Sequence, residues 1–335
     1  MTTSTKVSIC LPTCDRPHLI VRCIDSCLEQ THADLEILIG DDSRDDRTER
    51  LIATRYGHEP RVVYRRNTPP LGQARNVESL FTRATGDKIL LIHDDDYLIT
   101  NGVERLLAQW DRHPGLDVAF GNQYEVDQHE RIDLAASRKL NEAFHRTPRA
   151  AGLQRQPGRV GLVQMFPNNG WMANAALVKR IGYDGHYGTC CDFVFGTRLC
   201  LAAQQVCYVD EYVSCYRKTD VSVSQATRHT TSAASMAAWQ FVKGLALPPA
   251  LEPARKMALR RLVPIVVSLY ARNGQARTGL NLALHHLHAY RYGLSPRLYY
   301  HLLMIGKAAR HARRAPVPTP IAGEQGVDTP RVRLP

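Results

Sequence analysis

The sequence has no apolar run long enough to span a membrane, so no transmembrane helix is predicted. Its first ten residues, MTTSTKVSIC, lack the charged start, long apolar stretch and small-residue cleavage site of a signal peptide. None of the nine cysteines forms a C-x-x-C pair. Small buried thiols are therefore a better interpretation of them than zinc ligands or disulfides. These absences predict a cytoplasmic chain with reduced thiols.

Acidic residues are scarce in the C-terminal third. From residue 241 onward there are 15 Lys and Arg but only 3 Asp and Glu, a net charge of +12. The whole chain carries +11, so residues 1–240 carry −1. The basic part could favour an anionic surface or an acidic substrate, and a basic face in water is the alternative. It contains no nucleic-acid recognition module or aromatic platform, so no nucleic-acid partner is predicted.

Short apolar runs alternate with helical patterns over the first 126 residues. Strands are predicted at Val7–Leu11, Leu35–Ile39, Arg61–Tyr64, Lys88–Ile92 and Val118–Gly121. Helices are predicted from Pro17 and over Asp46–Tyr56, Gly72–Ala84 and Val103–Trp110. This alternation predicts an α/β fold with a mainly parallel sheet and helices on both faces. Ligands of such sheets bind beyond the carboxyl ends of the strands.

The remainder has weaker patterns. Residues 127–165 are polar and basic, which indicates a long surface excursion or a flexible flap. A helix over Phe193–Ala203 and a strand over Gln205–Val209 follow. The predicted organisation is one domain over residues 1–232, a basic helical region over 233–315 and a disordered Pro-rich tail over 316–335.

Two acidic turns follow strands of the predicted sheet. His93-Asp94-Asp95-Asp96 comes directly after one strand, and Asp41-Asp42-Ser43 after another. Adjacent carboxylates suit Mg²⁺ or Mn²⁺, which leave positions open for phosphate oxygens. A carboxylate at the second turn could accept a hydrogen bond from a nucleotide base or ribose. The alternatives are a solvated loop for the first turn and a helix cap for the second.

A Gly-containing turn with an arginine lies between these strands, in the segment N-x-x-P-x-G-x-A-R-N that ends at Asn76. Arg75 is suited to bidentate contact with phosphate, because its guanidinium is planar. Pairing with one of the acidic turns is the alternative for this side chain.

Four segments together resemble a known family. VSICLPTCDRP (7–17), LEILIGDDSRDDRT (35–48), PLGQARN (70–76) and GDKILLIHDDDY (86–97) are similar, in order and spacing, to the motifs of family-2 glycosyltransferases of the GT-A fold. The resemblance is strong over about residues 5–125 and traceable to about residue 224. It implies inverting transfer of a sugar from a nucleotide-diphosphate donor to an acceptor hydroxyl or amine, with Mn²⁺ or Mg²⁺. A UDP-sugar is the expected donor, and a dTDP- or GDP-sugar is the alternative.

The resemblance also implies roles for the donor side, residues 1–126. Pro12-Thr13-Cys14 would lie against the base, where many members have an aromatic residue in place of Cys14. Asp42 would bind the base, and Asp41 would support that turn. Asp94 and Asp95 would contribute to donor binding.

For the metal, the resemblance implies Asp95 as the ligand. Asp94 and Asp96 would assist by contacting the ribose, the metal or the residues around the metal. His93 stands where an Asp is frequent in the family.

The acceptor side, residues 127–232, would contain the general base. CCDFVFGTRL (190–199) resembles the family's Glu-Asp element, with Asp192 as the base and Cys191 in place of the Glu. A helix cap is the alternative for Asp192. Asn168 and Trp171 resemble an acceptor-side loop, where Trp171 would stack on a sugar or lie in the core. The acceptor itself would be a glycan, a lipid-linked molecule or a small molecule.

YRKTDVSVS (216–224) resembles the family's closing Y-R-x-H-x-x-S element, with Thr219 where the family usually has His. Further along, Leu298, Leu302, Ile305 and Ala309 recur at helical spacing beside basic residues. This pattern indicates either a helix on an anionic membrane, at the inner face, or a helix packed on the rest of the protein.

Three other functions agree less well with the sequence. A non-catalytic nucleotide-sugar-binding or scaffold protein agrees with the departures at Cys191 and Thr219. A sugar nucleotidyltransferase would need a Gly-rich N-terminal loop, and PTCDRP has no glycine. A dinucleotide-dependent oxidoreductase would need G-x-G-x-x-G after the first strand, and this is absent.

Overall fold

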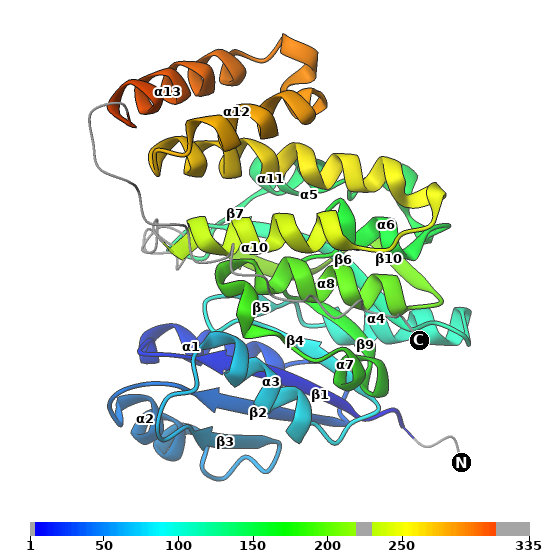
Figure 1. The fold of residues 1–335 in the computed structure, drawn as a ribbon. Helices are drawn as coiled ribbons and strands as arrows, with labels where there is room; N and C mark the ends of the chain where they lie inside the picture. Colours follow the sequence, from blue (N-terminus) through cyan, green and yellow to red (C-terminus); the bar gives the residue numbers. More distant parts are fainter. Residues whose placement is uncertain (1–3, 219–229, 313–335) are drawn as a thin grey trace. The chain divides into compact units, whose positions relative to one another are not determined.

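The computed structural model describes residues 4–218 and 230–312 (Figure 1). The chain divides into two compact units. The first comprises residues 1–185 and 191–222, and the second comprises residues 186–190 and 223–335. The tail predicted from residue 316 lies outside the described residues.

The first unit contains one large mixed sheet. Its strands are β1 (Val7–Thr13), β2 (Leu35–Asp41), β3 (Val62–Arg66), β4 (Lys88–Leu91), β5 (Tyr97–Leu98), β6 (Val118–Val126), β7 (Ile132–Asp133), β8 (Gly152–Leu153), β9 (Trp171–Asn174) and β10 (Val206–Arg217). The order is β3-β2-β1-β4-β9-β6-β10-β5, with β7 beside β6 and β8 beside β10. Strands β1 to β4 run parallel, as do β6 and β10, whereas β9 is antiparallel to both neighbours. The predicted α/β fold with a mainly parallel sheet is confirmed.

Helices accompany the strands of this unit. They are α1 (Pro17–Leu28), α2 (Arg47–Tyr56), α3 (Gln73–Arg83), α4 (Gly102–Arg112), α5 (Leu134–Ala143), α6 (Pro157–Leu162), α7 (Ala175–Ile181) and α8 (Cys191–Ala202), with 3-10 turns η1 (Pro148–Ala150) and η2 (Gly185–Cys190). Every residue of β2 is buried, as expected for a parallel strand covered on both faces. Helix α1 starts with Pro17 in its first turn and turns Ile20, Cys23, Ile24 and Cys27 inward.

Residues 127–165 are more ordered than the sequence suggested, which corrects the prediction of a flexible flap. They contain α5, α6 and β8, and two polar side chains of α5 are buried against β6. Asn141 Oδ1 accepts from the backbone N–H of Gln123 at 3.1 Å, and Ser137 Oγ accepts from that of Glu125 at 2.8 Å. The segment looked exposed because hydrogen-bonding side chains, rather than apolar ones, attach it to the sheet.

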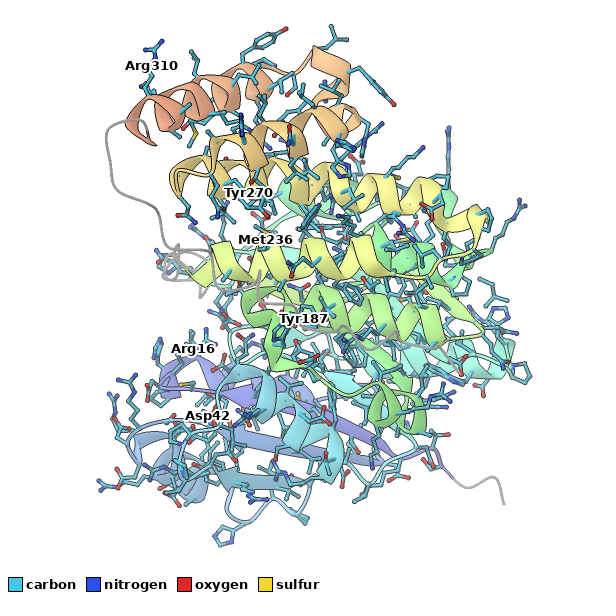
Figure 2. All side chains as sticks on the ribbon, viewed as in Figure 1. Arg16, Asp42, Tyr187, Met236, Tyr270 and Arg310 are labelled. Atoms are coloured by element: carbon cyan, nitrogen blue, oxygen red, sulfur yellow. The ribbon has the colours of Figure 1, made fainter. Side chains whose placement is uncertain are left out.

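The second unit is helical within the part of the chain that the structure describes. Its elements are α10 (Thr230–Gly244), η3 (Pro249–Leu251), α11 (Glu252–Arg272), α12 (Ala276–His285), η4 (Leu287–Gly293) and α13 (Pro296–Ala312). Tyr270 of α11 donates to the sulfur of Met236 of α10 at 3.9 Å (Figure 2). Leu298 and Ile305 of α13 are each 6% exposed, because α13 packs on α11 and α12. These two residues therefore belong to the core of the helical unit, which supports the packed alternative for them. None of the described helices combines the length and apolar character that a membrane span requires.

Candidate active site

Three loops meet at the carboxyl edge of the parallel strands. Strand β1 lies between β2 and β4, so the turns that follow these strands are neighbours. Thr13 Oγ1 at the end of β1 donates to Asp94 Oδ2 at 2.7 Å. The backbone N–H of Asp42 donates to the carbonyl of Thr13 at 3.0 Å. The two acidic turns therefore converge on the end of β1, as the sequence predicted from strand order.

The Asp42 carboxylate is held by the turn before α3. Its Oδ1 accepts from Asn67 Nδ2 at 2.8 Å and from the backbone N–H of Leu71 at 3.1 Å. Asn67 Nδ2 also donates to Asn76 Oδ1, and Asn76 Nδ2 donates to the carbonyl of Gly40 at 2.7 Å. A Cβ on Gly40 would lie 2.1 Å from Asn76 Oδ1, so glycine is needed for this close approach. The two asparagines of the N-x-x-P-x-G-x-A-R-N segment thus orient Asp42.

Asp41 is fully buried and fixes its own turn. Its Oδ1 accepts from the backbone N–H of Ser43 at 2.8 Å, and its Oδ2 accepts from the Tyr64 hydroxyl at 2.7 Å. Burial raises the pKa of Tyr64, and this bond to Asp41 raises it further, so the phenol remains a donor. These contacts agree with a supporting position for Asp41.

The remaining donor-side residues differ in exposure. Pro12 is partly buried in β1, whereas Cys14 and Arg75 are exposed. The thiol of Cys14 lies 3.5 Å from the carbonyl oxygen of Asp42. Among the described residues Arg75 forms no ion pair with either acidic turn, which contradicts the structural-bridge alternative.

Arg16 is a site residue that the sequence analysis missed. Its Nη2 lies 2.5 Å from Asp94 Oδ1, and its Nη1 donates to Asp95 Oδ2 at 2.9 Å (Figure 2 labels Arg16). One guanidinium thus neutralises two neighbouring carboxylates. The sequence could have indicated this role, because Arg16 lies just after β1 and the acidic turn follows β4, the strand that pairs with β1.

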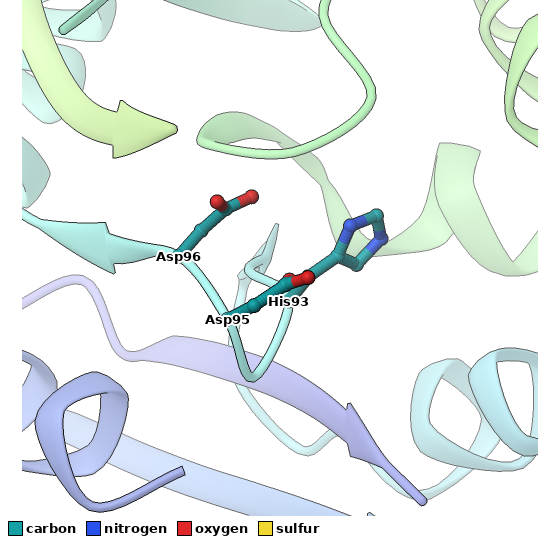
Figure 3. Close-up of side chains that lie close together, drawn as sticks. All are labelled: His93, Asp95 and Asp96. Atoms are coloured by element: carbon teal, nitrogen blue, oxygen red, sulfur yellow. The ribbon is translucent and has the colours of Figure 1, made fainter. Parts of the chain in front are cut away.

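His93, Asp95 and Asp96 form the candidate metal site. One ligand atom from each lies within 4.8 Å of the others, and all three side chains come from the loop between β4 and β5 (Figure 3). Asp96 accepts from the backbone N–H of Arg217 at 2.8 Å and from Asn169 Nδ2 at 2.5 Å. Burial raises the pKa of Asp96, and the charge of Asp95 raises it further. The two carboxylates suit Mn²⁺ or Mg²⁺, whereas an imidazole is more typical of other transition metals, so the fit to the predicted metal rests on Asp95 and Asp96.

Asp94 is distinct from these three residues. It is fully buried, and its two oxygens face Thr13 and Arg16. Burial raises its pKa to about 6, although the charge of Arg16 acts in the opposite direction. Its contacts are those of a residue that organises the turn.

Asp192 lies in the first turn of α8 and is part-buried. Its Oδ1 accepts a short hydrogen bond from the hydroxyl of Tyr183, a fully enclosed side chain packed on Phe81 and Phe195. Asp192 and His93 line the same cavity, whose volume is about 290 Å³. This is close to the lower end of the usual range for ligand sites, about 300–1,000 Å³. The cavity thus joins the predicted base to the metal cluster.

In the acceptor-side loop, the structure corrects the predicted position of Trp171. Asn168 is exposed and lines the cavity, but Trp171 is 0% exposed in β9, among Phe81, Phe166 and Phe195. Stacking of Trp171 on a sugar is therefore wrong, and the core alternative holds, because β9 is a central strand. The polar residue that the sequence analysis missed is Asn169, which donates to Asp96.

Gly170 permits the close approach of the loop of residues 168–171 to β10. Its φ is +70°, and a Cβ there would lie 2.4 Å from Ser214 Oγ. Arg217, at the end of β10, donates from Nε to the carbonyl of Asp95 at 3.0 Å. Residues 219–224 of the segment that resembles the closing Y-R-x-H-x-x-S element, Thr219 included, lie outside the described residues.

Comparison with known proteins identifies the first unit. Residues 8–169 match the sequence model described as Glycosyl transferase family 2. These residues form a family-2 glycosyltransferase domain. The resemblance predicted from the four motifs is thereby confirmed.

Curated relatives of this glycosyltransferase domain match over part of their length. A chondroitin synthase of Escherichia coli is 32% identical over 123 residues, which are 36% of this chain and 18% of the relative. An abequosyltransferase of Salmonella typhimurium is 31% identical over 145 residues, 42% of this chain and 41% of the relative. The chain thus spans less than half the length of these curated relatives.

Solved structures resemble more of the chain. TarS 1–349 of S. aureus, in complex with UDP-GlcNAc, has a TM-score of 0.64 at 15% identity and covers 92% of this chain and 90% of its own. The mannosyltransferase PcManGT of Pyrobaculum calidifontis, in complex with GDP-Man and Mn²⁺, has a TM-score of 0.57 at 13% identity, covering 93% and 87%. These similarities confirm the GT-A type of fold.

Proposed function

We propose that this chain is an inverting glycosyltransferase that moves a sugar from a nucleoside-diphosphate donor to an acceptor hydroxyl or amine. The observation that carries the proposal is the shared cavity of Asp192 and His93. It brings a carboxylate suited to general-base catalysis beside a cluster suited to a divalent ion. In the proposed organisation, residues 1–126 bind the donor, residues 127–232 carry the acceptor side, and residues 233–315 form a basic helical region.

In this proposal Asp192 takes the proton from the acceptor as its oxygen or nitrogen attacks the anomeric carbon. The acceptor atom forms its bond on one face of the sugar while the diphosphate leaves from the other, so the anomeric configuration inverts. Tyr183 occupies Oδ1 of Asp192, which leaves Oδ2 for the proton. The bond also orients the carboxylate, because Tyr183 is itself fixed by packing.

The donor would lie along the ends of β1, β2 and β4. Asp42 would accept from the base or ribose through Oδ2, since Asn67 and Leu71 use Oδ1. Pro12, Thr13 and Cys14 would border the base, and Arg75 would reach phosphate oxygens. A UDP-sugar is the proposed donor; the structural neighbours were solved with UDP-GlcNAc and with GDP-Man, so GDP is tested beside it.

A divalent ion, Mn²⁺ or Mg²⁺, would be held by Asp95 with His93 and Asp96. When bound, it would neutralise the leaving diphosphate. Asp95 Oδ1 is the available ligand atom, because Oδ2 pairs with Arg16. Arg16 already compensates part of the negative charge of Asp94 and Asp95, so the metal ion would add its charge to that of a resident cation.

The test is calorimetric titration of UDP, dTDP and GDP, with and without Mn²⁺, into wild type and Asp95→Ala. We expect metal-dependent binding of one nucleotide, lost in Asp95→Ala and retained in Asp111→Ala, a matched change of an exposed carboxylate on α4. Absence of all nucleotide binding by the folded protein would overturn the proposal. Nucleotide binding without sugar transfer to any acceptor would favour the scaffold alternative.

We further propose that the helical unit docks on an anionic membrane surface, in agreement with a cytoplasmic location at the inner face. Large side chains of η4 and α13 are exposed: Tyr292 by 76%, Leu294 by 84%, Tyr299 by 60%, Tyr300 by 57% and Leu303 by 68%. Arg291, Arg297 and Arg310 of the same elements are also exposed, and Arg310 projects outward (Figure 2). Exposed aromatic and apolar groups beside arginines are typical of peripheral binding to anionic lipid.

Co-sedimentation with phosphatidylglycerol and phosphatidylcholine vesicles tests the docking surface. The wild type should sediment with the anionic vesicles, and Tyr299→Ser combined with Leu303→Ser should reduce this severalfold. Leu134→Ser on α5, which is 55% exposed, is the matched control and should have no effect. Wild-type protein that remains in the supernatant with both vesicles would overturn the docking surface and leave the transferase proposal intact.

A further inference from the structure

The cavity beside Asp192 contains a buried arginine without an acidic partner. Arg146 lines this cavity and is only 3% exposed. Burial lowers its pKa to about 10, and Tyr208 acts in the opposite direction; no carboxylate of the described residues contributes. The guanidinium therefore stays positive at neutral pH. A charge enclosed in this way is unfavourable unless a negative group compensates it.

The guanidinium is only partly satisfied by hydrogen bonds. Nη1 donates to Gln123 Oε1 at 3.1 Å, whereas Nε is buried and has no partner in the described part of the chain. The backbone N–H of Arg146 donates to the carbonyl of Asn141 at 2.8 Å, which anchors the residue at the end of α5. An arginine fork with donors to spare matches the oxygens of a carboxylate or phosphate.

A hydrogen-bond chain connects Arg146 to the metal cluster. Gln123 Nε2 donates to Asn169 Oδ1 at 3.1 Å, and Asn169 Nδ2 donates to Asp96 Oδ2 at 2.5 Å. Because a guanidinium can only donate, it fixes the orientation of the Gln123 amide, which in turn fixes that of Asn169. Each amide therefore accepts through its oxygen on the Arg146 side and donates through its nitrogen on the Asp96 side.

The charges of the cavity define what it can accept. Asp192 lines it and Asp96 lies behind Asn169, whereas Arg146 is the only Lys or Arg side chain among the described residues that line it. With Arg146, one part of the cavity attracts an anion while Asp192 faces another part. A substrate with a hydroxyl and an anionic group fits both.

Resting on the proposed function, we propose that the acceptor carries an anionic group, a carboxylate or a phosphate, and that Arg146 binds it. The acceptor rather than the donor is assigned, because the same cavity contains the carboxylate that would deprotonate the acceptor. Recognition would consist of a charge-assisted hydrogen bond from Arg146 to the anion, while the hydroxyl of the same molecule reaches Asp192.

The experiment uses the full chain saturated with Mg²⁺ and the nucleoside diphosphate that binds most tightly, so that the diphosphate position is filled. Binding of D-glucose, D-glucuronate and glucose 6-phosphate is then measured by ligand-observed NMR. We expect both anionic probes to bind at least tenfold more tightly than glucose. Equal binding of all three by wild type would overturn the proposal without any variant, and nucleotide binding would separately report on the proposed function.

Variants separate recognition from a structural role. Arg146→Gln should weaken binding of the anionic probes at least tenfold more than binding of glucose, and Arg146→Lys should retain part of the preference. Arg149→Gln, an exposed change of the same charge three residues away, should have no effect. Equal weakening of all three probes by Arg146→Gln would indicate a purely structural arginine and overturn the proposal. A preference for UDP-glucuronic acid over UDP-glucose that depends on Arg146 would move the anion to the donor and overturn the acceptor assignment.

Discussion

The hydroxyl of Tyr183 donates to Oδ1 of Asp192. This bond orients Asp192, which is the only acidic side chain among the described residues that line the cavity. Tyr183 is 4% exposed and lies between the rings of Phe81 and Phe195. Removing the hydroxyl preserves the packing but frees the carboxylate to rotate. The pair therefore offers a test of Asp192 that does not remove its charge.

Tyr183→Phe should lower kcat by about 10- to 100-fold with little change in the KM for the donor. The lost bond to a charged group is worth about 1.5–3 kcal/mol, and about 1.4 kcal/mol corresponds to a tenfold change in rate. Steady-state kinetics would measure both constants. The control is Tyr56→Phe, which removes a hydroxyl that donates to Asp25 at 2.6 Å on α1. Equal losses in the two variants would indicate general destabilisation and contradict the positioning role.

Nucleotide should protect Cys14 from alkylation. Cys14 is exposed, whereas the other eight cysteines are buried or half-buried. Partial burial raises its pKa to about 11, and nearby Asp15 and Asp42 contribute in the same direction. The thiolate is the reactive form, so labelling by iodoacetamide should be slow at pH 7 and accelerate about tenfold per pH unit up to pH 9.

Mass spectrometry would follow the labelling of Cys14, with Cys14→Ser as the control for site assignment. Saturating nucleotide should slow the labelling severalfold at every pH. An unchanged rate in protein that binds nucleotide calorimetrically would place the base away from Cys14.

Metal affinity should fall as the pH is lowered from 7.5 to 5.5. Burial raises the pKa of the ligand Asp96, and the charge of Asp95 raises it further. Protons therefore compete with the metal near neutral pH, and each proton displaced weakens binding by up to about tenfold per pH unit. Titration of Mn²⁺ at several pH values would measure this slope, and Asp95→Asn should abolish binding. A pH-independent affinity would contradict the proposed ligands.

Glu36 should contribute to stability against acid. Burial alone would raise its pKa, but hydrogen bonds from Ser8, Thr85 and Lys6 outweigh burial and lower it from 4.5 to about 2. Because the folded-state pKa is depressed, the stabilisation is complete above pH 4.5 and is lost as the pH falls from 4.5 to 2.

Glu36→Gln should therefore lower the free energy of unfolding by about 2 kcal/mol at pH 7 and by less at pH 3. Urea denaturation at both pH values measures the difference. Glu142→Gln, at an exposed position on α5, is the control and should change little. An equal loss at pH 3 and pH 7 would show that the charge of Glu36 is not responsible.

The donor side of the site could be predicted from the sequence because its residues directly follow strands, and the order of these strands along the chain is visible in the sequence. Asp42 and Asp95 follow strands directly, and parallel neighbouring strands end at the same edge. Arg16 follows β1 and obeys the same rule, but a lone arginine has no sequence pattern that marks it as an ion-pair partner of a distant turn. Trp171 was ambiguous, since an aromatic residue near a Gly-Asn turn is compatible with both a ligand platform and a core strand.

The acceptor side could not be predicted to the same degree because its contacts join distant segments. Asn169 meets Asp96 across 73 residues, and Arg146 meets Gln123 across 23. Within 127–165 the contacts are between polar side chains, which leave no periodic apolar pattern. Sequence periodicity therefore predicted a long surface excursion or a flexible flap where the structure has α5 and α6.

Local patterns in the chain were enough to predict the parallel α/β order, the family and the two acidic turns, because strand periodicity and adjacent motifs are local properties. Which charges are compensated depends on the three-dimensional fold: Arg16 pairs with two aspartates, whereas Arg146 stays without an acidic partner in the described chain. The cost of burying a charge depends on the groups that enclose it, and these groups come from distant segments that meet only when the chain folds.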